Sequence, residues 1–322
     1  MDVGRLLKNA LRPIVHYITD YIRGRQLKSA RPPISNERLV EDLSRLPVDR
    51  GSIVLVHSSL KALGYVEGGP ATVVDVLVNV FVERNAGTVM LPTYSIAGTM
   101  HATLLTGEAF DVRTTPSNLG AIPEAFRRHP DAIRSIHPTH SFAAIGPDAR
   151  WLVEEHHTCG TSFGTGSPMA KALDRHCYLL GLGTNLGNVT YYHCLEEMEP
   201  DFPINVFTAD SPISVECTDQ EGRLHRLEVR AHDRNISQTR IDRPENHGIR
   251  NFFTRWFERH ADLQWFQVGE ARSWLMRADI MYGEAKLLMK RGITIYTTTS
   301  ELDSIERRDI SHGSSAQEQN AG

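Results

Sequence analysis

Short apolar runs alternate with amphipathic stretches through the middle of the chain, and each apolar run ends in polar residues. The runs at 52–56 and 88–91 have the length and the β-branched composition of buried strands. Apolar positions at helical spacing accompany them at 36–46 and 71–84. Alternating strands and helices predict an α/β sheet, whose ligands bind beyond the carboxyl ends of the strands. We therefore expect the polar turns after these strands to line a binding site.

The rest of the chain predicts further elements of one folded domain over residues 35–305. We expect strands at 141–145, 178–182 and 293–297, helices at 118–128, 147–156, 269–277 and 278–290, and a hairpin over 213–229. A length of 322 residues is sufficient for the apolar core of such a domain. The segment 306–322, which ends in a run of polar residues, is expected to be a mobile tail.

Residues 1–34 form a basic extension before this domain. Seven basic side chains stand against two acidic ones, and the apolar residues between them follow helical spacing. Because charges interrupt the apolar positions, the segment resembles neither a signal peptide nor a membrane span. We expect an amphipathic helix that packs on its own domain or on a second copy of the chain in a homodimer. Weak contact with an anionic membrane or another partner is the alternative.

Composition and charge indicate an ordinary globular protein. Hydrophobic residues make up 40% of the chain and charged residues 23%, which argues against disorder. The formal net charge of -4 leaves no basic excess to neutralise phosphates, so we expect no nucleic-acid partner. The four cysteines form no C-x-x-C pair and are interpreted as reduced thiols of a soluble cytoplasmic protein.

Two glycine-rich segments are candidates for binding a phosphorylated ligand. Residues 181–187 follow a predicted strand, as a dinucleotide site would, but the third glycine comes one place too late for G-x-G-x-x-G. Residues 160–168 resemble a phosphate-binding loop in composition but lack the G-K-[ST] ending. The backbone amides of this second segment can hold a pyrophosphate, and a plain turn is the alternative.

The histidines are the candidates for chemistry. His193 and Glu196 lie three residues apart and share one face if the segment is helical. A histidine in that position can accept a proton from an attacking amine, whereas a buried structural histidine is the alternative. The pairs His193-x-x-Glu196 and His137-x-x-His140 can also be interpreted as metal ligands of a zinc hydrolase, although no H-E-x-x-H occurs.

Seven short motifs occur in a fixed order between residues 35 and 300 and are specific as a set. They are Val56-His57-Ser58-Ser59-Leu60 with Leu63-Gly64, Leu91-Pro92-Thr93-Tyr94, Thr115-Pro116-Ser117-Asn118-Leu119-Gly120 with Glu124-Ala125-Phe126-Arg127, Arg134-Ser135-Ile136-His137-Pro138-Thr139-His140-Ser141-Phe142, Gly166-Ser167-Pro168-Met169, Leu180-Gly181-Leu182-Gly183, and Thr190-Tyr191-Tyr192-His193-Cys194-Leu195-Glu196. Together they resemble the aminoglycoside 3-N-acetyltransferases of the antibiotic acetyltransferase group. The resemblance implies an α/β fold with a mixed sheet flanked by helices, distinct from the common N-acetyltransferase superfold. It also implies an antibiotic-resistance enzyme that uses acetyl-CoA as co-substrate and needs no metal.

The resemblance places the catalytic histidine at His193 and the CoA groove along a set of turns. The residues of this groove are His57, Ser58, Ser59, Leu60, Thr93, Ser117, Gly120 and Ser167. Strand-end turns and helix N-termini offer backbone amides to the pyrophosphate of CoA, which fits this placement. Helix capping is the alternative role of Ser58 and Ser59.

The expected mechanism is direct transfer without an acyl-enzyme. His193 takes the proton as the amine attacks the thioester, and nearby donors hold the oxyanion. An acid orients His193. Glu196 is the expected acid, and Asp111 and Glu124 are alternatives.

The acceptor amine is the open question, because the sequence departs from the family in places. The acidic run at 197–201 can receive a polycationic aminoglycoside or can simply be solvated. The region 230–262, which holds His232, His247 and His260, matches the family poorly. A cellular amino sugar or a biosynthetic amine is therefore the alternative acceptor. An inactive binding protein is a further alternative, which failure to bind acetyl-CoA would favour.

Overall fold

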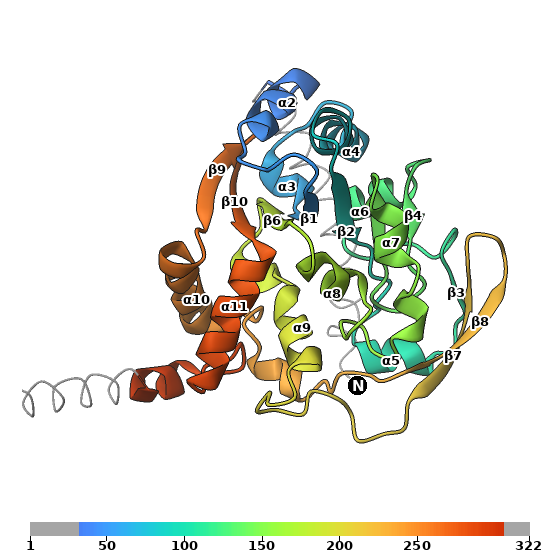
Figure 1. Cartoon of the computed structure of the whole chain (residues 1–322), viewed down its shortest axis with the longest axis vertical. Coiled ribbons are helices and arrows are strands. Elements are labelled where there is room, and N and C mark those ends of the chain that lie inside the picture. The colour runs from blue at the N-terminus through green and yellow to red at the C-terminus, as the bar shows by residue number, and fades with distance from the viewer. Residues whose placement is uncertain (1–31, 306–322) are drawn as a thin grey trace, which may run out of the picture.

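A computed structural model describes residues 32–305 and places a seven-stranded mixed sheet at the centre of the fold (Figure 1). Across the sheet the strands are β4 (Ile133–Arg134), β5 (Phe142–Ile145), β2 (Thr88–Pro92), β1 (Ile53–Ser58), β6 (Cys177–Leu182), β10 (Ala271–Arg277) and β9 (Gln264–Val268). The three central strands β2, β1 and β6 are parallel, and the outer strands pair antiparallel. The α/β sheet predicted by the pattern and the mixed sheet implied by the resemblance are thereby confirmed.

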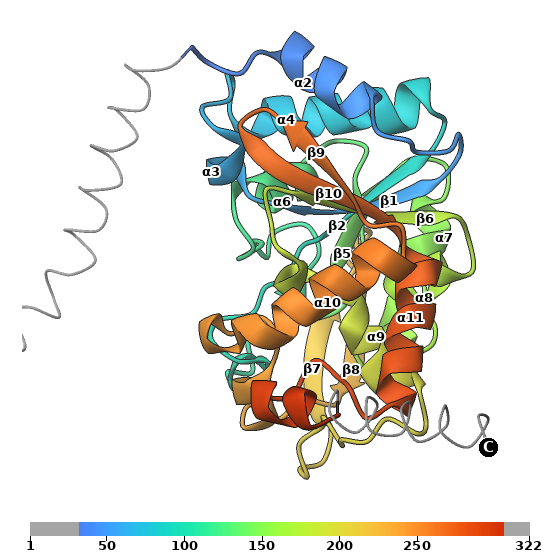
Figure 2. The same cartoon turned by 90° about the vertical axis from the view of Figure 1, so that its left-hand side faces the viewer.

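Helices cover both faces of this sheet, as Figure 2 shows. One face carries α2 (Asn36–Ser44), α4 (Pro70–Leu77) with its π-helical continuation η1 (Val78–Arg84), and α6 (Ala121–Arg127). The other face carries α7 (Ala149–Val153), α8 (Pro168–Leu173), α9 (Tyr191–Met198), α10 (His247–His260) and α11 (Ala278–Lys290). Shorter elements connect these layers: α3 (Leu60–Leu63), α5 (Met100–Leu105), η2 (His156–Thr158), η3 (Leu186–Asn188), η4 (Ile236–Thr239) and η5 (Pro244–Asn246).

Strand β1 explains why the central runs of the sequence are apolar throughout. Ile53 and Leu55 pack into the core on the α9 side, and Val54 and Val56 pack into the core on the α4 side. Successive side chains of a strand point to opposite faces, so a strand covered on both faces needs apolar residues at every position.

A second, smaller sheet lies beside the first. It consists of β3 (Phe110–Asp111), β7 (Ile213–Thr218) and β8 (Leu224–Val229). Strands β7 and β8 form the hairpin expected over 213–229, and Gly222 turns it with a φ of +84°. With α5, this sheet buries a third apolar cluster around Phe110.

Two predicted elements are wrong. Residues 269–277 were expected to be helical, but Ala271–Arg277 forms β10, which pairs antiparallel with both β6 and β9. Burial on both faces removes the alternation that marks a strand. Residues 293–297 were expected to form a strand, but no strand is assigned there. Instead, the Thr297 hydroxyl accepts a hydrogen bond from the amide of Thr294 at 2.8 Å, and such local side-chain bonds compete with strand pairing.

Packing explains Gly181 and Gly183 in the glycine-rich segment 181–187. A Cβ at Gly181 would lie 2.0 Å from the Trp274 indole, which is fully buried. The indole lies over β6 and donates a hydrogen bond from Nε1 to the carbonyl of Thr184 at 2.9 Å. At Gly183 a Cβ would lie 2.4 Å from Cβ of Ala62. These glycines admit close neighbours, and a dinucleotide site is not needed to explain them.

The basic extension predicted over 1–34 falls outside the described residues except for 32–34, and the tail predicted over 306–322 falls outside them entirely. Between residues 32 and 305, none of the helices combines the length and the apolar character needed to cross a membrane.

Candidate active site

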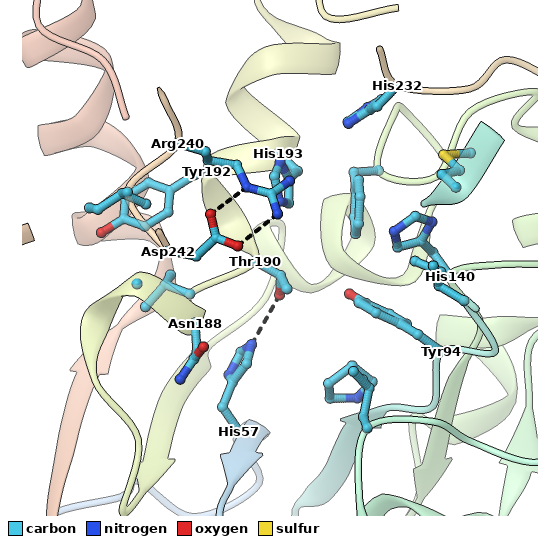
Figure 3. A pocket seen from close by; sticks show the side chains of 18 of the residues that line it. His57, Tyr94, His140, Asn188, Thr190, Tyr192, His193, His232, Arg240 and Asp242 are labelled. Carbon is cyan, nitrogen blue, oxygen red and sulfur yellow. Dashed lines mark hydrogen bonds and ion pairs between the residues drawn. The ribbon is translucent and has the colours of Figure 1, made fainter. Parts of the chain in front are cut away.

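A cavity of about 450 Å³ opens at the carboxyl ends of the three parallel strands (Figure 3). His57, Ser58 and Ser59 line it at the end of β1, Tyr94 lines it beyond β2, and Thr184 lines it beyond β6. The polar turns after the strands therefore do lie together, as the alternating pattern predicted.

Helix α9 and the loop between β8 and α10 supply further walls of the cavity. Thr190, Tyr192 and His193 come from the start of α9. The loop residues are His232, Asp233, Arg234, Arg240, Ile241, Asp242 and Arg243, hereafter the 232–243 loop. Arg240 and Asp242 form a two-pronged ion pair with both separations at 2.8 Å.

His193 and Glu196 form a dyad on one face of α9. The Nδ1 atom of His193 lies 2.8 Å from Oε2 of Glu196. The Glu196 side chain is 0% exposed, whereas the His193 side chain is 14% exposed and lines the cavity. Phe163 stacks on the His193 ring with a centroid separation of 5.1 Å and an interplanar angle of 27°. The carboxylate and the phenyl ring together fix the orientation of the imidazole.

The electrostatics of the dyad favour an ionised Glu196. Burial opposes ionisation of this carboxyl, but the charge of His193, its hydrogen bond and the charge of His232 hold the pKa of Glu196 below its ordinary value. A carboxylate at this place accepts the proton of Nδ1, and the neutral imidazole then carries its lone pair on Nε2. Burial raises the pKa of Tyr296, and the negative charge of Glu196 raises it further.

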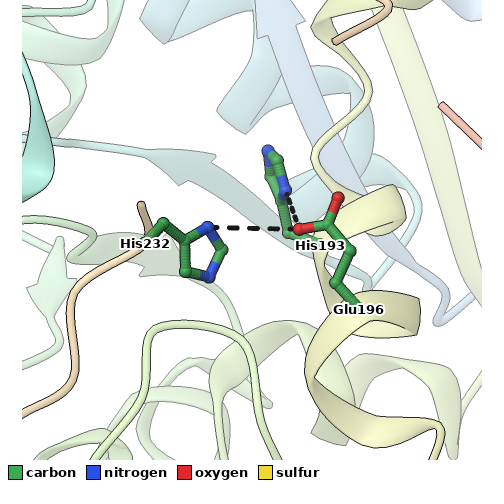
Figure 4. Close-up of side chains that lie close together, drawn as sticks. All are labelled: His193, Glu196 and His232. Carbon is green, nitrogen blue, oxygen red and sulfur yellow. Dashed lines mark hydrogen bonds and ion pairs between the residues drawn. The ribbon is translucent and has the colours of Figure 1, made fainter. Parts of the chain in front are cut away.

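His232 belongs to the site, although sequence reasoning did not assign it there. Its Nε2 atom lies 2.7 Å from Oε1 of Glu197. Its Nδ1 atom lies 4.0 Å from Oε2 of Glu196 (Figure 4). The other oxygen of Glu197 accepts a hydrogen bond from the amide of Phe163 at 2.6 Å. Burial opposes protonation of His232, but the bond to Glu197 and the two carboxylate charges raise its pKa above the ordinary value. Glu197 thus ties the 232–243 loop and the Phe163 turn to α9.

The strand-end wall carries polar groups in their neutral forms. Nε2 of His57 lies 3.1 Å from the hydroxyl of Thr190, and burial lowers the pKa of His57 to about 4. Burial raises the pKa of Tyr94 well above its ordinary value, so its hydroxyl keeps its proton. That hydroxyl points toward Thr190 in Figure 3. Burial also lowers the pKa of His140, whose ring packs edge-on against Tyr94.

Of the eight residues expected to line a CoA groove, His57, Ser58 and Ser59 line the cavity, and the other five do not. Leu60 begins α3, which the Ser59 hydroxyl caps, whereas the Ser58 hydroxyl has no hydrogen-bond partner within residues 32–305. Ser167 caps α8 by accepting a hydrogen bond from the amide of Ala170.

The remaining three residues of the expected CoA groove are Thr93, Ser117 and Gly120. The Thr93 hydroxyl is buried against Ser141 and accepts a hydrogen bond from Arg134 at 3.2 Å. Ser117 donates its amide to Glu124 at 2.8 Å, and Gly120 precedes α6 with a φ of +110°. These side chains organise the wall, and their neighbours Leu119 and Pro123 line the cavity.

The three acids that were expected as partners of His193 differ in their contacts. Asp111 pairs with Arg113 at 2.6 Å, and Glu124 pairs with Arg127 at the same distance. Glu196 is the acid that contacts His193.

The acidic run at 197–201 was also interpreted as a binding surface for a cationic acceptor. None of its residues lines the cavity. Glu197 is fully buried against His232, and Glu199 accepts a hydrogen bond from Tyr282 and pairs with Lys286. The carboxylates on the cavity wall are Asp233 and Asp242 instead.

The pair His137-x-x-His140 is not arranged as metal ligands. Nδ1 of His137 accepts hydrogen bonds from the amides of Thr139 and His140, and Nδ1 of His140 lies 3.0 Å from the hydroxyl of Ser162. Both rings hold the turn before β5 in place.

Comparisons with known proteins agree with this arrangement. A model of the aminoglycoside 3-N-acetyltransferase family matches residues 55–290. Aminoglycoside N(3)-acetyltransferase VIII of Streptomyces fradiae is 33% identical over 207 residues, which cover 59% of this chain and 70% of the relative. The SPbeta prophage-derived aminoglycoside N(3')-acetyltransferase-like protein YokD of Bacillus subtilis is 31% identical, over 54% of this chain and 69% of the relative.

Solved structures show the same fold. Sisomicin-bound AAC-VIa aligns with a TM-score of 0.64 at 27% identity, over 81% of this chain and 99% of that one. The CoASH complex of AAC-IIIb aligns with a TM-score of 0.62 at 21% identity, over 80% and 97%. The fold expected from the resemblance is thus confirmed, and the chain belongs to the aminoglycoside 3-N-acetyltransferase family.

Proposed function

We propose that this protein transfers an acetyl group directly from acetyl-CoA to an amine of an aminoglycoside, with His193 as general base. The observation that carries the proposal is the His193–Glu196 dyad at the cavity wall. Acetyl-CoA is the donor that an acetyltransferase family uses, and the relatives named above are aminoglycoside N(3)-acetyltransferases.

The dyad prepares His193 for its role. Glu196 accepts the Nδ1 proton, so the lone pair of Nε2 is available to an amine bound in the cavity. As the amine nitrogen attacks the thioester carbon, Nε2 takes one of its protons, and a tetrahedral intermediate forms. Collapse of the intermediate breaks the carbon–sulfur bond and releases the CoA thiolate, which takes up the proton from the imidazolium. No covalent bond to the protein is required.

Hydroxyl donors for the oxyanion lie on the strand-end wall. Tyr94 keeps its proton because it is buried, and Thr190 shares a hydrogen bond with His57 next to the start of α9. A donor fixed before the reaction stabilises the developing charge without reorganisation, which is the usual source of oxyanion stabilisation.

The end of β1 is the proposed place of the CoA chain. The Ser58 hydroxyl is buried there without a hydrogen-bond partner among the described residues, and it lines the cavity. A buried hydroxyl without a partner is destabilising unless a ligand satisfies it. AAC-IIIb, which shares the fold, is known as a complex with CoASH.

The charges of the 232–243 loop affect which acceptor amine the cavity can bind. Asp233 and Asp242 can receive ammonium groups such as those of sisomicin, with which AAC-VIa is solved. Three arginines of the same loop, at 234, 240 and 243, also line the cavity. Because the three arginines outnumber the two aspartates by one, these residues give the cavity wall a net positive charge, which disfavours a strongly polycationic acceptor. This observation favours a less highly charged amino sugar or biosynthetic amine as the second candidate.

Release of the CoA thiol from acetyl-CoA tests the proposed function. We expect release with at least one aminoglycoside of a panel that includes sisomicin, gentamicin and kanamycin, and none without an acceptor. Monoamino sugars serve as the comparison set. Release with these alone would replace the aminoglycoside by the second candidate, and silence of the whole panel would refute both.

Replacement of Glu196 by Gln tests the orienting acid. We expect kcat to fall roughly 10- to 100-fold with little change in the KM for acetyl-CoA, because an amide no longer fixes the Nδ1–H tautomer. Glu216→Gln, the same change at an exposed position of β7, is the matched control. Equal kcat values for the two variants would remove Glu196 from the mechanism.

A further inference from the structure

Three possible metal ligands converge beside the cavity. They are Nδ1 of His193, a carboxylate oxygen of Glu196 and a ring nitrogen of His232, and all lie within 4.8 Å of one another (Figure 4). Two of the separations are 2.8 Å and 4.0 Å. Two ligands of a tetrahedral ion with bonds of about 2.1 Å lie about 3.4 Å apart, so small side-chain shifts would bring the three into coordination.

The hydrogen bonds around His232 hold it as a ligand would be held. Its Nε2 atom lies 2.7 Å from Glu197, so the Nε2–H donates to that carboxylate and the lone pair of the neutral ring is on Nδ1. Nδ1 is the atom that faces Glu196. A histidine whose second nitrogen donates to a carboxylate is the usual arrangement at zinc sites, because the carboxylate fixes the tautomer and raises the basicity of the ligand.

Two buried carboxylates belong to this cluster. Glu196 and Glu197 are neighbours in sequence, and both side chains are 0% exposed. Oε1 of Glu196 has no hydrogen-bond partner among the residues that the structure describes. His193 and His232 line the cavity, so an ion can reach the cluster from solvent.

We propose that His193, Glu196 and His232 form a reversible site for Zn²⁺ that inhibits the enzyme. The binding rests on the cluster alone, whereas the inhibition rests on the proposed function. Zinc on Nδ1 of His193 requires the tautomer in which the single ring proton of the neutral imidazole has moved from Nδ1 to Nε2. The Nε2 lone pair that would accept the proton of the amine is then lost, and the base is switched off.

The donor set predicts which ions bind. Two imidazoles and one carboxylate suit Zn²⁺, Cu²⁺ and Ni²⁺, whereas Mg²⁺ and Ca²⁺ require six or more oxygen ligands. We therefore expect zinc binding that millimolar Mg²⁺ does not compete away.

Calorimetric titration of the full-length, chelator-treated protein with ZnCl₂ tests the site without any acetyl transfer. We expect the wild type to bind one Zn²⁺ per chain at micromolar zinc. The His232→Asn variant should bind Zn²⁺ at least about tenfold more weakly. His247→Asn, at an exposed histidine outside the cluster, is the matched control and should bind like the wild type. Visible absorption of the Co²⁺-loaded wild type gives a second measurement that needs no variant, since four-coordinate Co²⁺ shows intense bands.

The outcomes separate the site from its effect. Absence of zinc binding, or equal affinities of His232→Asn and His247→Asn, overturns the site whatever the enzyme acetylates. Zinc binding with loss of turnover that a chelator restores is the expected result. A zinc-saturated enzyme with full turnover overturns the inhibition, whereas the role of His193 as base is tested separately by replacement of that residue.

Discussion

Replacing His193 by Asn is expected to lower kcat about 10²- to 10⁴-fold while the Kd of acetyl-CoA stays unchanged. The side-chain amide of Asn can still donate to Glu196 from a position close to that of Nδ1, so the buried carboxylate keeps a partner. What is lost is the lone pair of Nε2. The loss therefore isolates proton transfer from the packing of α9.

The measurement is single-turnover acetyl transfer, with calorimetry for binding of acetyl-CoA. His176→Asn is the matched control, since this exposed histidine precedes β6 on the side of the sheet away from the cavity wall. A His193→Asn enzyme within threefold of the control would show that another group takes the proton. A parallel loss of acetyl-CoA binding would assign His193 to the donor site.

Replacing Arg134 by Met is expected to lower the free energy of unfolding by about 3–5 kcal/mol. The guanidinium is buried and donates to the carbonyls of Thr93, Val112 and Thr115 and to the hydroxyls of Thr93 and Ser141. Burial lowers the pKa of Arg134 to about 9, so the group stays charged at neutral pH. Methionine fills the volume but leaves buried carbonyls without donors, and each such group costs about 1–3 kcal/mol.

Urea unfolding followed by circular dichroism measures this change. Arg150→Met, at an exposed position of α7, is the matched control and is expected to shift stability by less than about 0.5 kcal/mol. Arg134→Lys keeps the charge without the fork of donors and should fall between the two. A loss below about 1 kcal/mol for Arg134→Met would mean that water replaces the guanidinium.

The sequence was sufficient for the parts of the fold that rest on local pattern. The apolar runs that became β1, β2 and β6 are buried on both faces, and their polar ends meet at the cavity as expected. The dyad could be predicted for the same reason, because His193 and Glu196 are separated by about one helical turn. Spacing along one element is a property that the sequence displays directly.

Residues that meet through tertiary contacts were not predictable in this way. His232 reaches Glu196 and Glu197 from a loop that is distant in the sequence, and its spacing to those residues does not predict the contact. Its one signal was the density of charges from Asp233 to Arg243, which is unusual for a plain connection. Thr93 and Ser117 were expected along the CoA groove but do not line the cavity. The Thr93 hydroxyl accepts a hydrogen bond from Arg134, and the Ser117 amide donates to Glu124, two contacts made by residues from separate motifs or turns.

The contact between Gly181 and Trp274 restricts which substitutions these two positions can accept. No larger residue is tolerated at 181 while the indole lies over β6, and a smaller residue at 274 opens a void beside His57 and removes the donor to Thr184. The two positions belong to paired strands far apart in the chain, so neither can change alone without a loss of packing. Evolution at this place therefore requires two compensating substitutions, and members of the family that lack the glycine are expected to lack the tryptophan too.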